Sequence, residues 1–405
     1  MTEDSIENIP KYSSTHPEST SFTSWFDNNF KGDKIIWLIG IFLALIGILV
    51  VYSATGTLAY KELKNTEYYL SKHILNVLTA LLVMWIAHRI DYRYYSKIAR
   101  LGLLISVPLL LITWKFGVNV NEANRWITIP IIKSNFQPSD LAKLALIASI
   151  ASMLSKRQDN VDDFQETILP ILIWTGVICT LIGLSNFSNA VLLFTTSLIL
   201  MFIGRIPVSQ LMMFLMVGFI SLMLSLYLGQ RLETVQSRLD KYFNPSKEEV
   251  FQAEQSYIAI STGGFLGKGP GNSTQRNFLP NAYSDYPYAI IVEEYGFLGG
   301  IIVLGLYILF LSRGVLVVAN SSQAFGGLLA AGLTFSLVLQ AALNISVSVG
   351  LVPITGIPLP MISMGGTSLL FMGLALGIIL SVSRGEVEKN IVTPKLGNVF
   401  KKKAD

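Results

Sequence analysis

The chain has 405 residues, of which 52% are hydrophobic and only 14% are charged. A soluble globular protein carries roughly 25% charged residues, so this composition excludes an ordinary soluble enzyme and predicts an integral membrane protein. The net charge of +4 does not indicate nucleic-acid binding, because the Lys and Arg residues lie at the ends of apolar segments rather than on one basic face.

The chain divides by composition into three parts. Residues 1–33 are polar, rich in Ser, Thr and Asn, and lack the apolar core of a cleavable signal peptide, so we expect a disordered cytoplasmic tail. Residues 34–384 form a transmembrane domain, and residues 385–405 form a basic cytoplasmic tail. The single cysteine, Cys179, excludes an intrachain disulfide and a cysteine-based metal site.

Hydropathy predicts an all-α polytopic membrane protein with about ten transmembrane helices. An apolar helix of roughly 17–25 residues is long enough to cross about 30 Å of hydrocarbon. The expected spans are residues 35–53, 73–89, 98–114, 140–154, 167–184, 188–203, 208–228, 287–312, 325–344 and 361–383.

The distribution of positively charged residues predicts the orientation of the chain in the membrane. If the N-terminus is cytoplasmic, the inner connections hold most of the Lys and Arg residues, as the positive-inside rule requires. An even number of spans then places the C-terminus in the cytoplasm as well. The inner cations are Arg89, Arg93, Lys97, Arg100, Lys156, Arg157, Arg205 and Arg313.

Two outer segments stand out, at residues 115–139 and 229–286. The second is a large extracytoplasmic loop between spans seven and eight, and loops of this length are usually functional or disordered. It keeps apolar and aromatic residues such as Tyr257, Phe265 and Phe278, so we expect it to be ordered.

Residues 344–370 are apolar but cannot form a continuous helix, because prolines and glycines interrupt them, among them Pro353, Gly356 and Pro358. Non-helical backbone at membrane depth must be buried in protein or line a wet cavity. The segment offers small hydroxyls such as Ser363 but no base. We therefore predict that it forms the wall of a polar site.

Asp285 is the candidate general base. It lies where the long outer loop meets the eighth span, and Pro287 is a natural first residue for that helix. A carboxylate that is partly desolvated at a membrane boundary gains basicity. The alternative is that Asp285 only caps the helix N-terminus.

Other charged residues also lie within or beside the spans. Asp140 and Lys143 are three residues apart on one helical face, so they can pair for purely architectural reasons or hold an anionic group. Glu293 and Glu294 lie inside the eighth span, where acids mark an internal site or a buried contact. Lys268 lies in a glycine-rich stretch that fails the P-loop pattern yet offers N–H groups and a cation to a diphosphate.

The longest motif is PITGIPLPMISMGGTS at 353–368. With this motif and several shorter ones in order, the chain resembles the shape, elongation, division and sporulation (SEDS) family from about residue 32 to residue 384. The shorter motifs are RWI at 125–127, FQPSD at 136–140, SRLDKYFNP at 237–245, LPNAYSDY at 279–286 and EEYGFLGG at 293–300.

The resemblance implies a peptidoglycan glycosyltransferase that polymerises lipid II into glycan strands at the outer face of the bacterial cytoplasmic (inner) membrane. It implies lipid II and undecaprenyl-diphosphate-linked glycan as substrates, and a class B penicillin-binding protein and other divisome proteins as partners. The family's proposed catalytic acid falls on Asp285, and its acid and lysine fall on Asp140 and Lys143.

We hypothesise an inverting reaction in which Asp285 takes the proton from the acceptor sugar. Arg125, Lys143, Lys268 or a divalent cation, Mg or Mn, would stabilise the leaving diphosphate. Glu294 and Ser363 are further candidates for substrate contacts.

The chain departs from the family pattern at three positions. Tyr283 stands where histidine is usual, Asn186 replaces an acid, and Met364 replaces tyrosine. The N-terminal extension and the runs at 32–40 and 51–60 are more similar to the FtsW branch than to the RodA branch, which favours septal synthesis. The alternatives are an elongation enzyme of the RodA type, and a lipid II flippase or scaffold without polymerase activity.

Overall fold

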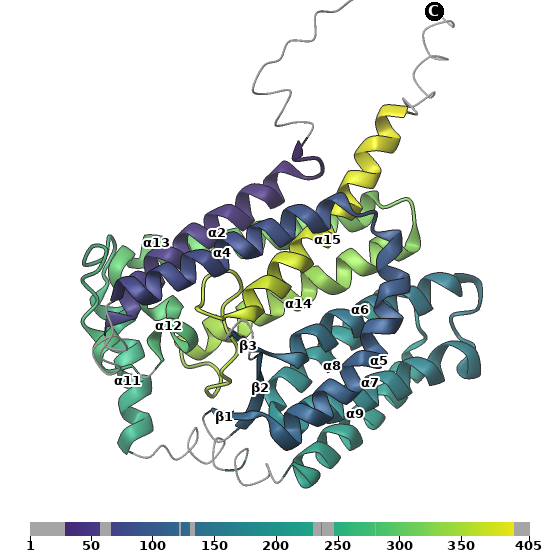
Figure 1. Ribbon diagram of the computed structural model, residues 1–405, viewed down its shortest axis with the longest axis horizontal. Helices are drawn as coiled ribbons and strands as arrows, with labels where there is room; N and C mark the ends of the chain where they lie inside the picture. Colours follow the sequence, from purple (N-terminus) through teal and green to yellow (C-terminus); the bar gives the residue numbers. More distant parts are fainter. Residues whose placement is uncertain are drawn as a thin grey trace, which may run out of the picture.

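The computed structural model describes residues 29–56, 66–120, 123–129, 134–229, 236, 247–279 and 281–392. The fold is a bundle of long helices (Figure 1). Each predicted span overlaps one of these helices, although the last begins in the irregular segment before its helix: α2 (Lys34–Ala54), α4 (Thr66–Arg89), α5 (Arg93–Phe116), α6 (Pro138–Lys156), α7 (Leu169–Ser185), α8 (Phe187–Ile203), α9 (Val208–Leu228), α13 (Pro287–Asn320), α14 (Ala324–Ser348) and α15 (Thr367–Val392).

The predicted helical membrane architecture is confirmed. Within the described ranges, eight helices are long and apolar enough to cross a membrane, namely α2, α4, α5, α7 with the π-turn before it, α9, α13, α14 and α15. The remaining two predicted spans lie on α6, which carries Asp140 and Lys143, and on α8, which has only 17 residues. That these two also span the membrane stays a prediction.

Parts of the predicted domain division lie outside the described residues. These are residues 1–28 of the expected N-terminal tail, residues 393–405 of the basic tail, and residues 230–235 and 237–246 of the large loop with its SRLDKYFNP motif. The described part of that loop contains α11 (Lys247–Thr262), η3 (Gln275–Asn277) and α12 (Ala282–Asp285).

The outer segment predicted between α5 and α6 contains strands that the sequence analysis did not predict. Three short strands form an antiparallel sheet in the order β1 (Val118–Val120), β2 (Ala123–Ile129) and β3 (Ser134–Phe136). Val118 pairs with Trp126, and Ile127 pairs with Phe136. Alternating β-branched and aromatic residues favour strands, but runs this short are hidden by a hydropathy average.

Helices α14 and α15 form the centre of the bundle and are the most buried of the eight spans. Helix α14 packs against α6, α8 and α13, whereas α15 packs along α4. A Cβ at Gly373 or Gly377 would collide with the backbone of Ala80 or Met84. Gly373 and Gly377, which have the GxxxG spacing typical of closely packed membrane helices, therefore let α15 approach α4 closely.

The other GxxxG pair has a different role. Gly296 has φ 72° and ψ −172°, a conformation that breaks α13 and that side chains with a Cβ rarely adopt. A Cβ there would collide with the backbone of Phe265 and Gly267 in the large loop. Gly296 therefore allows the large loop to dock at a break in the helix rather than a second helix to pack there.

The connections between helices that carry Lys and Arg residues lie at one end of the bundle. Arg313 pairs with Asp33 at the start of α2, while Arg89 contacts Asn29 and accepts a hydrogen bond from Arg384 at its carbonyl. These contacts join the start of α2 to the ends of α4, α13 and α15. The membrane side that this end faces stays the cytoplasmic prediction of the charge pattern.

Candidate active site

Asp285 ends the four-residue helix α12, directly before α13. Its side chain is half-buried. The N-cap residue of α13 is Tyr286, which makes no side-chain capping hydrogen bond, and Pro287 is the first helical residue, as predicted. The alternative that Asp285 only caps this helix is therefore wrong.

The broken segment at 351–366 positions α12. Ser363 Oγ donates to the carbonyl of Ser284 at 2.9 Å, and the Met364 N–H donates to the carbonyl of Tyr283 at 3.1 Å. From α14, Asn344 Nδ2 donates to the carbonyl of Asp285 at 3.2 Å. Three donors thus hold successive carbonyls of α12, which fixes the direction of the helix that carries the candidate base.

The carbonyls of the broken segment are satisfied by side chains from the helices around it. Asn344 Nδ2 also donates to the carbonyl of Ile357 at 2.9 Å. Gln340 Nε2 donates to the carbonyl of Pro358 at 2.9 Å, and the Tyr307 hydroxyl donates to that of Pro360 at 2.6 Å. Protein side chains here replace the water that irregular backbone needs at membrane depth.

Asp285 is half-buried and is followed by a fully buried residue. Tyr286 is buried, and burial raises the pKa of its hydroxyl well above the usual value. The neighbouring Asp285 and Tyr257 raise that pKa further by charge repulsion. The base candidate therefore lies at a boundary between an apolar interior and the outer loop.

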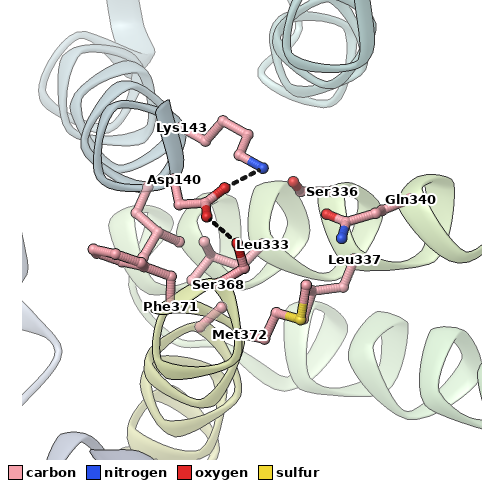
Figure 2. A pocket seen from close by; sticks show the side chains of 11 residues that line it. Asp140, Lys143, Leu333, Ser336, Leu337, Gln340, Ser368, Phe371 and Met372 are labelled. Carbon is pink, nitrogen blue, oxygen red and sulfur yellow. Dashed lines mark hydrogen bonds and ion pairs between the residues drawn. The ribbon is translucent and has the colours of Figure 1, made fainter. Parts of the chain in front are cut away.

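Asp140 and Lys143 form a buried ion pair on α6, as their spacing predicted. Lys143 Nζ is 2.8 Å from Asp140 Oδ1. Ser368, at the start of α15, donates to Asp140 Oδ2 at 2.5 Å, so the carboxylate joins two helices (Figure 2). Lys143 points past Asp140 towards the space between α6 and α14, where Gln340 also lies.

A cavity of about 90 Å³ brings several predicted site residues together. It is lined by Arg125, Asp140 and Lys143, and by Ser284, the neighbour of Asp285. Arg125 Nε donates to the carbonyl of Ser185 at 3.1 Å, which orients the guanidinium. Arg125 and Lys143 carry two positive charges and Asp140 one negative charge, so this lining favours binding of a phosphate group.

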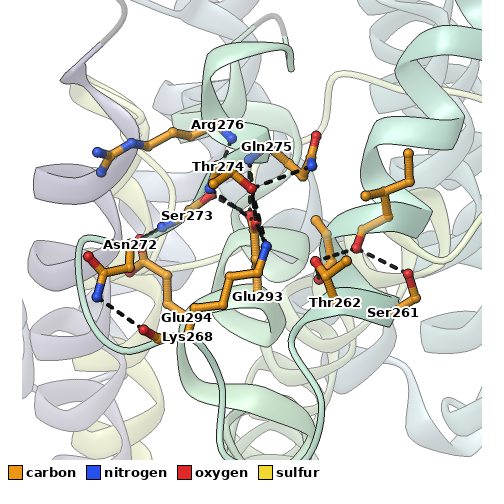
Figure 3. A network of polar contacts seen from close by, with 12 residues as sticks. Ser261, Thr262, Lys268, Asn272, Ser273, Thr274, Gln275, Arg276, Glu293 and Glu294 are labelled. Atoms are coloured by element: carbon orange, nitrogen blue, oxygen red, sulfur yellow. Dashed lines mark hydrogen bonds and ion pairs between the residues drawn. The ribbon is translucent and has the colours of Figure 1, made fainter.

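Glu293 and Glu294 anchor the large loop to α13 (Figure 3). The buried Glu293 carboxylate accepts hydrogen bonds from Lys268 Nζ at 2.6 Å and from the N–H of Thr274 at 3.0 Å. The buried Glu294 carboxylate accepts from the Ser273 N–H at 3.2 Å and from the hydroxyl of Ser53. These contacts favour a structural role for both acids, and substrate binding by Glu294 stays an untested prediction.

Two N–H groups of the glycine-rich stretch are used within the protein. The N–H groups of Lys268 and Gly269 donate to the carbonyls of Glu293 and Glu294 at 3.0 and 2.9 Å, at the break before Gly296. Lys268 Nζ is engaged by Glu293. The expectation that this stretch offers N–H groups to a diphosphate was therefore wrong for these two residues.

Sequence reasoning missed several polar residues of the cavity. Asn186, Asn189, Gln340 and Ser368 line it beside the predicted residues. Gln340 carried a usable signal, because an amide inside an apolar span marks an internal polar site. Among the described residues, no group of three His, Cys, Asp or Glu side chains is placed to hold a metal ion.

Comparison with known sequences identifies the family. The sequence profile of the FtsW, RodA and SpoVE family, described as "Cell cycle protein", matches residues 33–388. The chain belongs to this family. The SEDS resemblance of the motifs is thereby confirmed.

Relatives from several bacteria cover nearly the whole family domain. The probable peptidoglycan glycosyltransferase FtsW of Geobacter sp. (strain M18) is 32% identical over 359 residues, which cover 87% of this chain and 96% of that protein. Stage V sporulation protein E of Bacillus subtilis (strain 168) is 30% identical over 361 residues, or 87% and 97% of the two chains.

Solved structures show the same fold. The rod shape determining protein RodA of Thermus thermophilus superimposes with a TM-score of 0.65 at 21% identity, over 89% of this chain and 99% of RodA. A chain of a peptidoglycan synthase complex gives a TM-score of 0.68 at 23% identity, over 88% and 98% of the two chains. At these identities the likeness establishes the fold of the family domain.

Proposed function

We propose that this protein is a peptidoglycan glycosyltransferase that polymerises lipid II into glycan strands at the outer face of the bacterial cytoplasmic (inner) membrane. Membership of the family supports it, as do relatives named FtsW glycosyltransferases. The observation that carries the proposal is that hydrogen bonds hold α12, and that Ser284, the neighbour of Asp285 on this helix, lines a cavity together with Arg125 and Lys143.

Asp285 is the proposed general base. It takes the proton from the 4-hydroxyl of the acceptor lipid II as that oxygen attacks the anomeric carbon of the growing strand. The anomeric carbon–oxygen bond to undecaprenyl diphosphate breaks on the opposite face, so the reaction inverts the anomeric configuration. The proton ends on Asp285, and the bonding electrons leave with the diphosphate.

Arg125 and Lys143 are the proposed partners of the leaving diphosphate. Both line the cavity beside Ser284, and preorganised cations stabilise charge that develops in a transition state. Lys268 stays an untested candidate for this role, and its ammonium is paired with Glu293. A Mg or Mn ion stays a proposal, tested by polymerisation with and without a chelator. Such an ion would draw most of its ligands from substrate oxygens.

The proposed partner is a class B penicillin-binding protein that crosslinks the glycan, with other divisome proteins at the division septum. The FtsW names of several relatives favour the septum over elongation. The likeness to a chain in a peptidoglycan synthase complex supports a crosslinking partner. Depletion of the protein tests the role in cells, where a division enzyme gives filaments and an elongation enzyme of the RodA type gives rounded cells.

Purified protein and lipid II, with products separated on a gel, test the proposal against its rivals. Glycan strands formed by the protein alone, or only with its transpeptidase partner, support an enzyme. Movement of lipid II across vesicles without polymer supports a flippase, and neither activity supports a scaffold. Glu254→Gln, at an exposed acid of the same loop, is the matched control for variants of Asp285.

A further inference from the structure

A second cavity lies at the opposite end of α6 from the candidate active site. It has a volume of about 340 Å³ and is enclosed by the start of α5, the end of α6 and the start of α7. Lys143 and Lys156 are 13 residues apart on α6, a rise of about 20 Å, so the two cavities are separate. The second cavity lies at the end of the bundle that the charge pattern places in the cytoplasm.

The lining of this cavity is basic. It contains Arg100, Lys156 and Arg157 against one acid, Glu166, a net charge of +2 from three cations and one anion. Arg157 Nη2 is 3.3 Å from Glu166, in a pair that is open to solvent. Within the described part of the chain, Arg100 and Lys156 make no ion pair. Three cations with a single shared acid leave positive charge for a ligand.

Two polar atoms at the cavity lack the partners that buried atoms normally have. Arg157 Nη1 and Ser149 Oγ are both buried, and neither has a hydrogen-bond partner among the described residues. An unpaired buried donor costs about 1–3 kcal/mol, so such atoms are usually satisfied by a ligand or by water. A guanidinium and a hydroxyl on one cavity wall are donors for an anionic oxygen.

Part of the remaining wall is apolar. Leu103, Met153 and Trp174 line it. Ile98 on α5 and Ile173 on α7, beside the cavity, are each 54% exposed and therefore suited to acyl chains. A soluble anion needs no such apolar wall, whereas a phospholipid has both an anionic phosphate and an apolar glycerol–acyl region.

We propose that this cavity binds the phosphate of an anionic phospholipid from the inner leaflet. Arg100, Lys156 and Arg157 hold the phosphate, Ser149 donates a hydrogen bond to it, and Trp174 packs against the glycerol region. The site is independent of the glycosyltransferase chemistry, and nothing in it requires Asp285.

Native mass spectrometry of the full-length protein in detergent tests this site. With phosphatidylglycerol as the probe, we expect Arg100→Gln/Lys156→Gln to weaken binding about tenfold or more, because each cation near an anionic headgroup contributes to affinity. Arg93→Gln/Lys97→Gln removes the same charge from exposed positions on α5 outside the cavity, and should bind as the wild type does. Phosphatidylcholine should bind weakly to all three proteins.

Equal weakening in both double variants, or equal binding of the two lipids, would overturn the proposal. Competition with inorganic phosphate tests whether the ligand is a lipid or a soluble phosphate. If millimolar inorganic phosphate displaces phosphatidylglycerol, the site binds a soluble phosphate and the lipid assignment is wrong. Lys156→Glu, at an exposed side chain, is a second variant that should abolish selective binding without disturbing the fold.

Discussion

At the scale of single residues, the candidate site depends on charges that are buried and paired. Asp140 is only 5% exposed, and it contacts both Lys143 and Ser368. A buried ion pair is weak evidence for stability, yet removal of one partner typically costs about 3–5 kcal/mol because it strands the other charge. The pair is therefore either architectural or chemical, and variants of both residues separate the two roles.

Lys143→Met should lower both the thermal stability of the protein and its rate of lipid II polymerisation, because it leaves the Asp140 carboxylate buried without its cation. Asp140→Leu/Lys143→Met should recover much of the stability, since an apolar pair of similar size removes the stranded charge. If Lys143 holds the diphosphate, the double variant stays slow. Recovery of stability and full rate together would show that the pair is architectural.

At the scale of elements, two interruptions of helix geometry build the end of the molecule that carries Asp285. The broken segment at 351–366 holds α12 by its hydrogen bonds to Tyr283 and Ser284. The break at Gly296 lets the backbone of the large loop pair with α13. In both, other protein groups form hydrogen bonds with the irregular backbone. Such bonds are required within a membrane, where no water is present to form them.

Asn344→Leu should slow polymerisation more than it destabilises the protein, because the amide holds the carbonyls of Asp285 and Ile357 together. Loss of a buried hydrogen bond costs about 1–3 kcal/mol. If that loss displaces the base and raises the activation free energy, each 1.4 kcal/mol slows the reaction about tenfold. Initial rates and melting temperatures of the variant measure the two effects. Ser261→Ala, which removes a bond within α11 only, is the control and should leave the rate unchanged.

Gly296→Ala should detach the large loop from α13, because φ 72° and the nearby backbone of Phe265 both exclude a Cβ. Limited proteolysis should then cut the loop between α11 and α12 faster than in the wild type. Gly305→Ala in the same helix, where a Cβ meets open space, should be neutral or slightly stabilising. Equal protection of the loop in both variants would contradict this account of the break.

At the scale of the whole molecule, the sequence predicts what depends on local composition. Spans such as 35–53 and 208–228 lie within helices because hydropathy along one helix decides them. Contacts between distant segments were beyond such reasoning: Lys268 meets Glu293, 25 residues on, and Ser368 meets Asp140, 228 residues back. The position of Asp285 was predictable from its motif, but the donors that hold α12 appear only when α14 and the broken segment come together.

The central claim is that Asp285 is the general base of lipid II polymerisation. The initial rate of glycan synthesis by Asp285→Asn, purified with its transpeptidase partner and compared with wild type and Glu254→Gln, tests it most directly. General-base catalysis typically contributes 10²–10⁴-fold, so we predict a loss of at least about a hundredfold for Asp285→Asn and none for Glu254→Gln. A correctly folded Asp285→Asn protein that polymerises lipid II at the wild-type rate would contradict the account.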